Sequence, residues 1–151
     1  MLFRSLLKDR ISDKFFSWDA NTLPDGRYVV KVVASDSPAN SEAEALADEK
    51  ISQPFDIDNT PPAIRNLQAR RESPRVRVTL HAADAISTIK KAEYSVDGGD
   101  WQFVLPSDLI ADSLDEDFNF LTAELSPGEH TIAVRVYDKV DNVGVEKVVV
   151  K

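Results

Sequence analysis

The sequence predicts an all-β fold built from two antiparallel β-sandwich modules in tandem, and three observations support this. Residues 23–36 align without gaps on residues 125–138, a spacing of 102 residues (125 minus 23). Both copies alternate apolar and polar side chains with the period of a β-strand. Short segments of the same character fill the chain after Pro61-Pro62. A repeat spacing near 100 residues matches the length of one β-sandwich module.

The repeat extends beyond its gapless centre in both directions. Asp36 and Asn40 correspond to Asp138 and Asn142, and the shared glycine is Gly26 in one copy and Gly128 in the other. Glycine at this place predicts a tight turn before the strand. Further pairs at the same spacing are Phe16 with Phe118, Trp18 with Phe120, and Tyr28 with His130. Because His130 replaces a tyrosine, a hydrogen bond made by the phenol in the first copy is not assumed in the second.

Alternation within each copy predicts which side chains face a core. In the first copy the inward set is Tyr28, Val30, Val32 and Ala34; in the second it is His130, Ile132, Val134 and Val136. Val29 and Val33 point outward in the first copy, where the second has Thr131 and Arg135. Two outward valines predict contact with another domain or strand.

The second module is predicted to be complete and to span residues 60–151. Strand 75–83 alternates cleanly, and Asp97-Gly98 predicts a hairpin turn that needs positive φ. About seven short strands in some 90 residues are typical of a sandwich. They are expected at residues 63–70, 75–83, 90–96, 101–105, 117–125, 129–138 and 143–150.

The first module, residues 1–59 with its linker, is predicted to be incomplete. Only about three strands are expected, at residues 15–19, 27–36 and 52–57. Three strands bury one sheet face poorly. Two interpretations follow: either upstream residues of a longer protein complete the sandwich, or residues 1–59 pack as an appendage on the second module. An exposed remnant also predicts self-association. Within it, residues 41–50 favour a short helix, with a solvated acidic loop as the alternative.

Composition excludes several classes of function. Acidic residues outnumber Lys and Arg by 26 to 18, a net charge of −8, which argues against nucleic-acid binding. The apolar runs are too short for membrane insertion, and residues 2–7 are interrupted by Arg4, so no signal peptide is expected. The absence of cysteine excludes disulfides, thiolate nucleophiles and Cys-ligated metals.

The repeat pattern, followed by Asp58-Asn59-Thr60-Pro61-Pro62, resembles bacterial immunoglobulin-like and fibronectin type III-like modules of large exported or cell-surface proteins. Residues 94–101 are similar to a hairpin of such modules. The resemblance covers about residues 15–151. It implies a tandem immunoglobulin-like sandwich without a disulfide, in an extracellular, periplasmic or cell-surface protein. Such modules serve as spacers, stalks and docking domains, so the resemblance indicates fold better than function.

Catalysis is not expected. His81 alternates outward on a strand, and His130 lies at the edge of the predicted core. Neither stands in a metalloprotease spacing, and no serine lies in a nucleophile elbow. An enzymatic role would need a pocket that joins one histidine to a carboxylate.

The linker supplies the candidate metal ligands. Asp56, Asp58 and Asn59 precede the Pro-Pro pair, and Asp138 and Asp141 lie in the loop after the repeat strand of the second module. Hard oxygen ligands of this kind suit calcium, which takes six to eight of them. The alternative is that Asp and Asn serve as turn residues beside a linker already stiffened by proline. No cofactor is expected beyond this calcium hypothesis.

Trp101 and Phe103 share one face of a predicted strand. That face is interpreted as core, with a carbohydrate platform as the alternative. Taken together, the sequence predicts a non-catalytic structural and interaction region that positions or couples other domains of a larger exported bacterial protein. Its expected partners are those domains or other proteins. The alternative is a ligand-binding module for calcium or a glycan.

Overall fold

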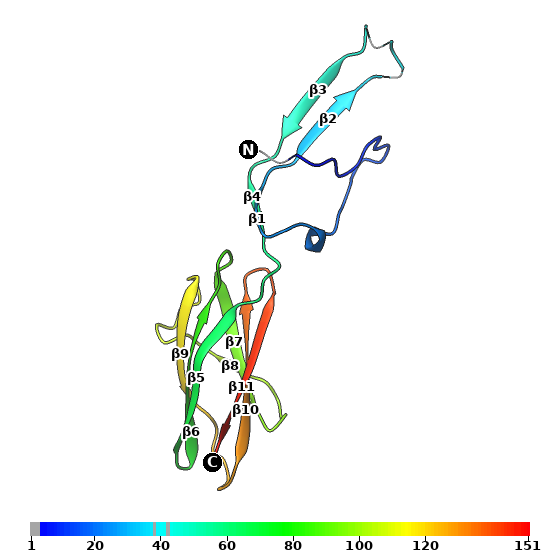
Figure 1. Cartoon of the computed structure of the whole chain (residues 1–151). Helices are drawn as coiled ribbons and strands as arrows, with labels where there is room; N and C mark the ends of the chain where they lie inside the picture. The colour runs from blue at the N-terminus through cyan, green and yellow to red at the C-terminus, as the bar shows by residue number, and fades with distance from the viewer. Residues whose placement is uncertain (1–3, 38, 42) are drawn as a thin grey trace.

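The strands within residues 63–150 pack into two facing sheets, and a smaller region precedes them along the long axis of the molecule (Figure 1). The computed structural model describes residues 4–37, 39–41 and 43–151. These residues form antiparallel strands and one short 3₁₀ helix, with no α-helix among them. The all-β class is therefore confirmed. We call residues 4–59 the first region, 60–151 the second region, and 58–62 the junction.

The second region has one three-stranded and one four-stranded sheet. The first sheet has the order β5-β6-β9 and the second β11-β10-β7-β8, with every neighbouring pair antiparallel. Each strand overlaps one of the ranges expected from the sequence. The bounds are β5 Ala63–Glu72, β6 Arg75–Ala83, β7 Ile89–Val96, β8 Gln102–Val104, β9 Asp115–Leu121, β10 His130–Asp138 and β11 Val143–Val150.

The core of the second region forms where the alternating faces of the two sheets meet. Val76, Val78 and Leu80 of β6 are buried, as predicted, while the residues between them lie toward solvent. Opposite them Ile132, Val134 and Val136 of β10 are buried, while His130 at the start of the strand is only partly buried. Phe118 of β9 is 1% exposed. Burial of thirteen apolar side chains from β6 to β11, with partly buried side chains of β5 packed against them, is what stabilises this region.

The predicted hairpin turn connects β7 to β8. Asp97 and Gly98 have φ of 52° and 76°, and the amide of Gly99 donates to the carbonyl of Val96 over 2.9 Å. Glycine reaches positive φ without steric cost, which explains the Asp-Gly pair at this place.

The first region consists of two small two-stranded sheets. Sheet β1-β4 pairs Gly26–Tyr28 with Phe55–Ile57, and sheet β2-β3 pairs Lys31–Ser35 with Ala47–Ile51. The strand predicted over 27–36 is thus divided into β1 and β2. Of the strand predicted over 52–57 only Phe55–Ile57 forms, as β4, and β3 lies before that range. The β2-β3 hairpin extends away from the junction as a thin ribbon (Figure 1).

Two predictions of secondary structure in the first region are wrong. Residues 15–19 form no strand; instead Phe16 stacks on Trp18 with ring centroids 6.1 Å apart, and η1 (Ala20–Thr22) follows. No helix forms over the described part of 41–50, where Ala47–Ile51 is β3. Glu42 lies outside the described residues. Pairing of β3 with β2 outweighs the helix propensity, since Leu46 is the one large apolar residue in the sequence 41–50.

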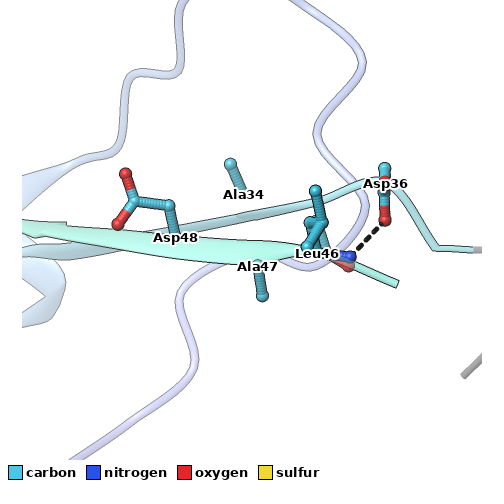
Figure 2. A pocket seen from close by; sticks show the side chains of 6 residues that line it. Ala34, Asp36, Leu46, Ala47 and Asp48 are labelled. Atoms are coloured by element: carbon cyan, nitrogen blue, oxygen red, sulfur yellow. Dashed lines mark hydrogen bonds between the residues drawn. The ribbon is translucent and has the colours of Figure 1, made fainter. Parts of the chain in front are cut away.

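The repeat is visible in the structure as matched local geometry. Gly26 and Gly128 both have positive φ, 148° and 127°. The amide side chain of Asn40 donates to Asp36 over 2.6 Å, and that of Asn142 donates to Asp138 over 2.8 Å. Figure 2 shows the end of the β2-β3 ribbon, where Asp36 also accepts the amide of Leu46 at 2.7 Å.

Corresponding side chains of the two copies of the repeat differ in solvent exposure. Val32 and Ala34 were predicted to face a core, but both are exposed, and Val32 is 58% exposed where its counterpart Val134 is 0%. No second sheet covers β2 among the described residues. The inward phase is therefore wrong for these two residues in the first region, although it is correct for Ile132, Val134 and Val136 of the second copy.

Candidate functional site at the junction

The first region holds the junction through Asp25, which lies just before β1. One carboxylate oxygen of Asp25 accepts the amide of Asn59 at 2.7 Å, and the other accepts the hydroxyl of Thr60. These two hydrogen bonds, that of Thr60 above all, hold the pKa of Asp25 below its usual range. The side-chain amide of Asn59 donates to the carbonyl of Leu23 over 3.0 Å. Residues 59 and 60 are therefore fixed to the turn that precedes β1.

The second region holds the same junction from the other side. Asn142 donates from Nδ2 to the carbonyl of Asp58 over 3.0 Å. Pro62 is buried, and its carbonyl lies so close to Gly144 of β11 that a Cβ at position 144 would overlap it. Glycine is therefore required where the linker crosses the edge of β11.

Three carboxylates meet where the junction reaches the second region. Asp58 belongs to the junction, Asp84 to the loop between β6 and β7, and Asp138 to the end of β10. One oxygen of each lies within 4.8 Å of the other two. We call these residues the carboxylate cluster. The topology explains why these residues meet, because β6 and β10 both terminate at the end of the sandwich that adjoins the junction.

Backbone amides orient each member of the cluster. Asp84 accepts the amides of Ile86 and Ser87 on Oδ1, both at 2.9 Å. Asp138 accepts the amides of Val140 and Asn142 on Oδ1, also at 2.9 Å. With one oxygen of each residue occupied by its own loop, the other is fixed in direction.

Asp58 follows the same pattern with a single bond. Its Oδ1 accepts the amide of Thr60 at 3.1 Å. Within the cluster, Oδ2 of Asp138 accepts Nδ2 of Asn142, whereas Oδ2 of Asp58 and Oδ2 of Asp84 are buried without a hydrogen-bond partner. The arrangement therefore offers three converging carboxylate oxygens, which are ligands of the kind that hard cations prefer.

Of the metal ligands predicted from the sequence, the structure brings together Asp58 and Asp138. Asp56 lies on β4, exposed and 3.4 Å from Arg27. Asn59 is engaged with Asp25 and Leu23, as described above. Asp141 lies at the tip of its loop with φ of 70° and pairs with Lys90 at 2.6 Å. These three residues therefore lie outside the cluster.

Asp84 was missed by the sequence analysis. It directly follows the predicted strand 75–83, whose end lies beside the junction once the strands are paired. That position, combined with its place before Ile86 and Ser87 in a turn, is the signal that could have identified it.

The predicted interaction residues lie on the surface. Val29 and Val33 are both more than half exposed, as expected for outward positions. The interpretation of Trp101 and Phe103 as core is wrong: Val104 is the buried residue of β8, and Phe103 is 60% exposed. The guanidinium of Arg135 lies 4.0 Å from the centre of the Trp101 ring, so that ring face is occupied by a cation. Binding at these four residues stays a prediction.

Both histidines lie beside carboxylates on the surface of the second region. His81 has Asp117 at 2.9 Å and Asp115 at 3.3 Å, across the pair of strands β6 and β9. His130 has Asp97 at 2.7 Å from Nδ1 and the carbonyl of Ser126 at 2.9 Å from Nε2. Two surface depressions, at the end of the β2-β3 ribbon and beside Pro74, are lined by neither histidine.

The hydrogen bond from Nε2 of His130 corresponds to that of Tyr28, whose hydroxyl donates to Pro24 over 2.6 Å. Histidine therefore replaces tyrosine while the bond is retained. Asp97 and, to a lesser degree, the carbonyl of Ser126 raise the pKa of His130 above its usual value. His130 thus has a structural role at the turn.

No protein-family model matches this chain, and no curated protein matches it. Among the described residues, no helix has both the length and the apolar character to cross a lipid bilayer.

Proposed function

We propose that this chain is a non-catalytic structural region that holds domains of a larger exported protein at a fixed spacing. The observation that carries the proposal is the junction, which is held by side chains from both regions at once. Asp25 holds residues 59 and 60 from one side, and Asn142 donates to the carbonyl of Asp58 from the other, where the backbone of Pro62 packs closely on Gly144.

A junction held in this way differs physically from a flexible linker. A flexible segment of five residues samples many orientations, whereas hydrogen bonds at both ends and two consecutive prolines remove most of that freedom. The resemblance to bacterial immunoglobulin-like and fibronectin type III-like modules supports the same role. The exposed valines of β2, Val32 and Val33, and the neighbouring Val29, supply apolar surface for adjacent domains or partner proteins.

The proposal is tested by measuring a distance between the two regions. Because the chain has no cysteine, Lys50→Cys on β3 and Lys147→Cys on β11 give two unique sites for spin labels, and both positions are exposed. Pulsed electron paramagnetic resonance should give one narrow distance distribution in the doubly labelled protein. Asn142→Ala together with Asp25→Ala should broaden it, since both ends of the junction are then released.

A matched control places both labels within the second region, at Lys147 and Arg70, so that only motion inside the sandwich contributes. A distribution between the two regions as broad in the wild type as in the doubly substituted variant would contradict the proposal.

A further inference from the structure

We propose that the carboxylate cluster is a calcium site that ties the junction to the end of the sandwich. Asp58, Asp84 and Asp138 supply the ligands, one each from the junction, the β6–β7 loop and the end of β10. The inference deepens the proposed function, on which its structural meaning rests, because the ion would regulate the stiffness of the same junction.

Acidic groups that lie close together do not by themselves indicate a metal site. In this cluster, two carboxylate oxygens are also buried without a hydrogen-bond partner. Oδ2 of Asp58 and Oδ2 of Asp84 are buried and make no hydrogen bond. The whole of Asp58 is only 9% exposed, and Asp138 is 0% exposed. A buried carboxylate oxygen without a donor costs free energy, and two beside a third carboxylate add mutual repulsion.

The protein itself does not neutralise the cluster. None of the ion pairs formed by the described residues involves Asp58, Asp84 or Asp138. Among the residues that the structure describes, the only side chain that donates a hydrogen bond into the cluster is that of Asn142, which is uncharged. A bound cation accounts for three negative groups being held together where two of them are buried and Asp84 is partly buried.

The kind and origin of the ligands favour calcium over magnesium. The three oxygens lie within 4.8 Å of one another, so one cation can contact all three. Magnesium demands a near-ideal octahedron and keeps several of its waters, whereas calcium takes six to eight oxygens in flexible geometry. Calcium also accepts carboxylates in either one-oxygen or two-oxygen mode and tolerates irregular geometry, as expected of ligands from three separate segments.

The test uses two substitutions that change only the free oxygens. In Asp58→Asn and Asp84→Asn the amide keeps an oxygen at Oδ1 for the backbone donors and replaces the unpartnered Oδ2 by NH₂. Isothermal titration of the chelator-treated full chain with CaCl₂ should show one site in the wild type. Each variant should bind at least about tenfold more weakly, because the charge and number of the ligands set calcium affinity.

Matched controls are provided by the predicted ligands that lie outside the cluster. Asp56→Asn and Asp141→Asn remove one negative charge each at nearby exposed positions, and both should bind calcium within about twofold of the wild type. A loss in these controls equal to that in Asp84→Asn would overturn the site, since it would indicate nonspecific attraction to an acidic surface.

Thermal unfolding adds a readout that a merely structural aspartate would not show. In calcium at about 100 times its dissociation constant, the folded state of the wild type should be favoured about 100-fold over its state in chelator. Asp84→Asn should unfold at a lower temperature than the wild type in calcium, but at a higher one in chelator, because the substitution then relieves repulsion.

Three results would overturn the proposal. The first is no calcium binding by the wild type at 10 mM CaCl₂, about ten times the weakest usual extracellular dissociation constant. The others are calcium binding by Asp58→Asn and Asp84→Asn as tight as that of the wild type, and tighter binding of MgCl₂ than of CaCl₂ by the wild type. The spin-label distances, measured with calcium and with chelator, keep the two proposals apart. Calcium binding with a broad distance distribution in both conditions would uphold the site and reject the rigid spacer; a narrow distribution without calcium binding would do the reverse.

Discussion

Two stretches of nearly the same sequence pattern, β1-β2 in the first region and β10 in the second, reach opposite degrees of burial. They share the glycine of positive φ, the hydrogen bond at the turn and the Asp-Asn pair after the strand. Yet β10 lies between β7 and β11 and faces a second sheet, while β2 pairs only with β3 among the described residues. Alternation thus encodes the local strand and its turns, and the neighbouring sheet decides whether its apolar face becomes a core.

The largest expected effect comes from the repeat pair Phe118 and Phe16. Phe118→Ala empties a site that is 1% exposed and should lower the free energy of unfolding of the second region by about 4 kcal/mol. Phe16→Ala removes a ring that is 39% exposed and stacked on Trp18, so about 1 kcal/mol is expected. Urea denaturation followed by circular dichroism measures both. Equal losses would mean that the first region also has a packed core.

Val134 and Val32 are corresponding residues of the repeat strand, so their substitution compares a buried with an exposed position. Val134→Ala should cost about 2 kcal/mol, since two buried carbons are lost and a cavity remains. Val32→Ala should stay within about 0.5 kcal/mol because that side chain is exposed. Both are measured by urea denaturation in the isolated chain. A large cost at Val32 would show that its face is covered in solution, for example by self-association, which sedimentation would then detect.

The smallest expected effect concerns the turn, where His130 replaces the tyrosine of the first copy. His130 lies between two acceptors, the Asp97 carboxylate and the Ser126 carbonyl, so the doubly protonated ring satisfies both. Because its pKa in the folded protein is raised above 6.5, the stabilisation is fully present below pH 6.5 and is lost as the pH rises through the folded value.

His130→Tyr restores the residue of the first copy and should remove this loss of stability above pH 6.5. The measurement is the melting temperature of wild type and variant across neutral and alkaline pH. Asp97→Asn is the companion variant, since it removes the partner that raises the pKa most. A wild-type melting temperature that does not change over this range would contradict the assignment.

The sequence was informative wherever a structure depends on nearby residues. Alternation located the strands of the second region, and Asp97-Gly98 located its hairpin, since both follow from local backbone preference and a buried face. The first region was harder. Capping and propensity favoured a helix over 41–50, but pairing with Lys31–Ser35 prevailed, and residues 15–19 kept their aromatic contacts without joining a sheet.

The carboxylate cluster shows the same limit for a site. Asp58 and Asp138 could be found because they flank the linker and end the repeat. Asp84 is 26 residues beyond Asp58 (84 minus 58) and enters the cluster only through the pairing of β5 with β6. Conversely, Asp56 and Asp141 are close in sequence to true members, but strand alternation and a loop tip direct them toward Arg27 and Lys90.

The direction in which the chain passes through the second region has a mechanical consequence. It enters at Ala63 beside the junction, and β11 ends with Val150 at the opposite end of the sandwich (Figure 1). A pull along the chain would therefore act parallel to β5 and β11, while their hydrogen bonds to β6 and β10 run across the strands. Such a load would be shared by a whole ladder of bonds, which must yield together, so the pairing of these strands resists separation along the length of this region.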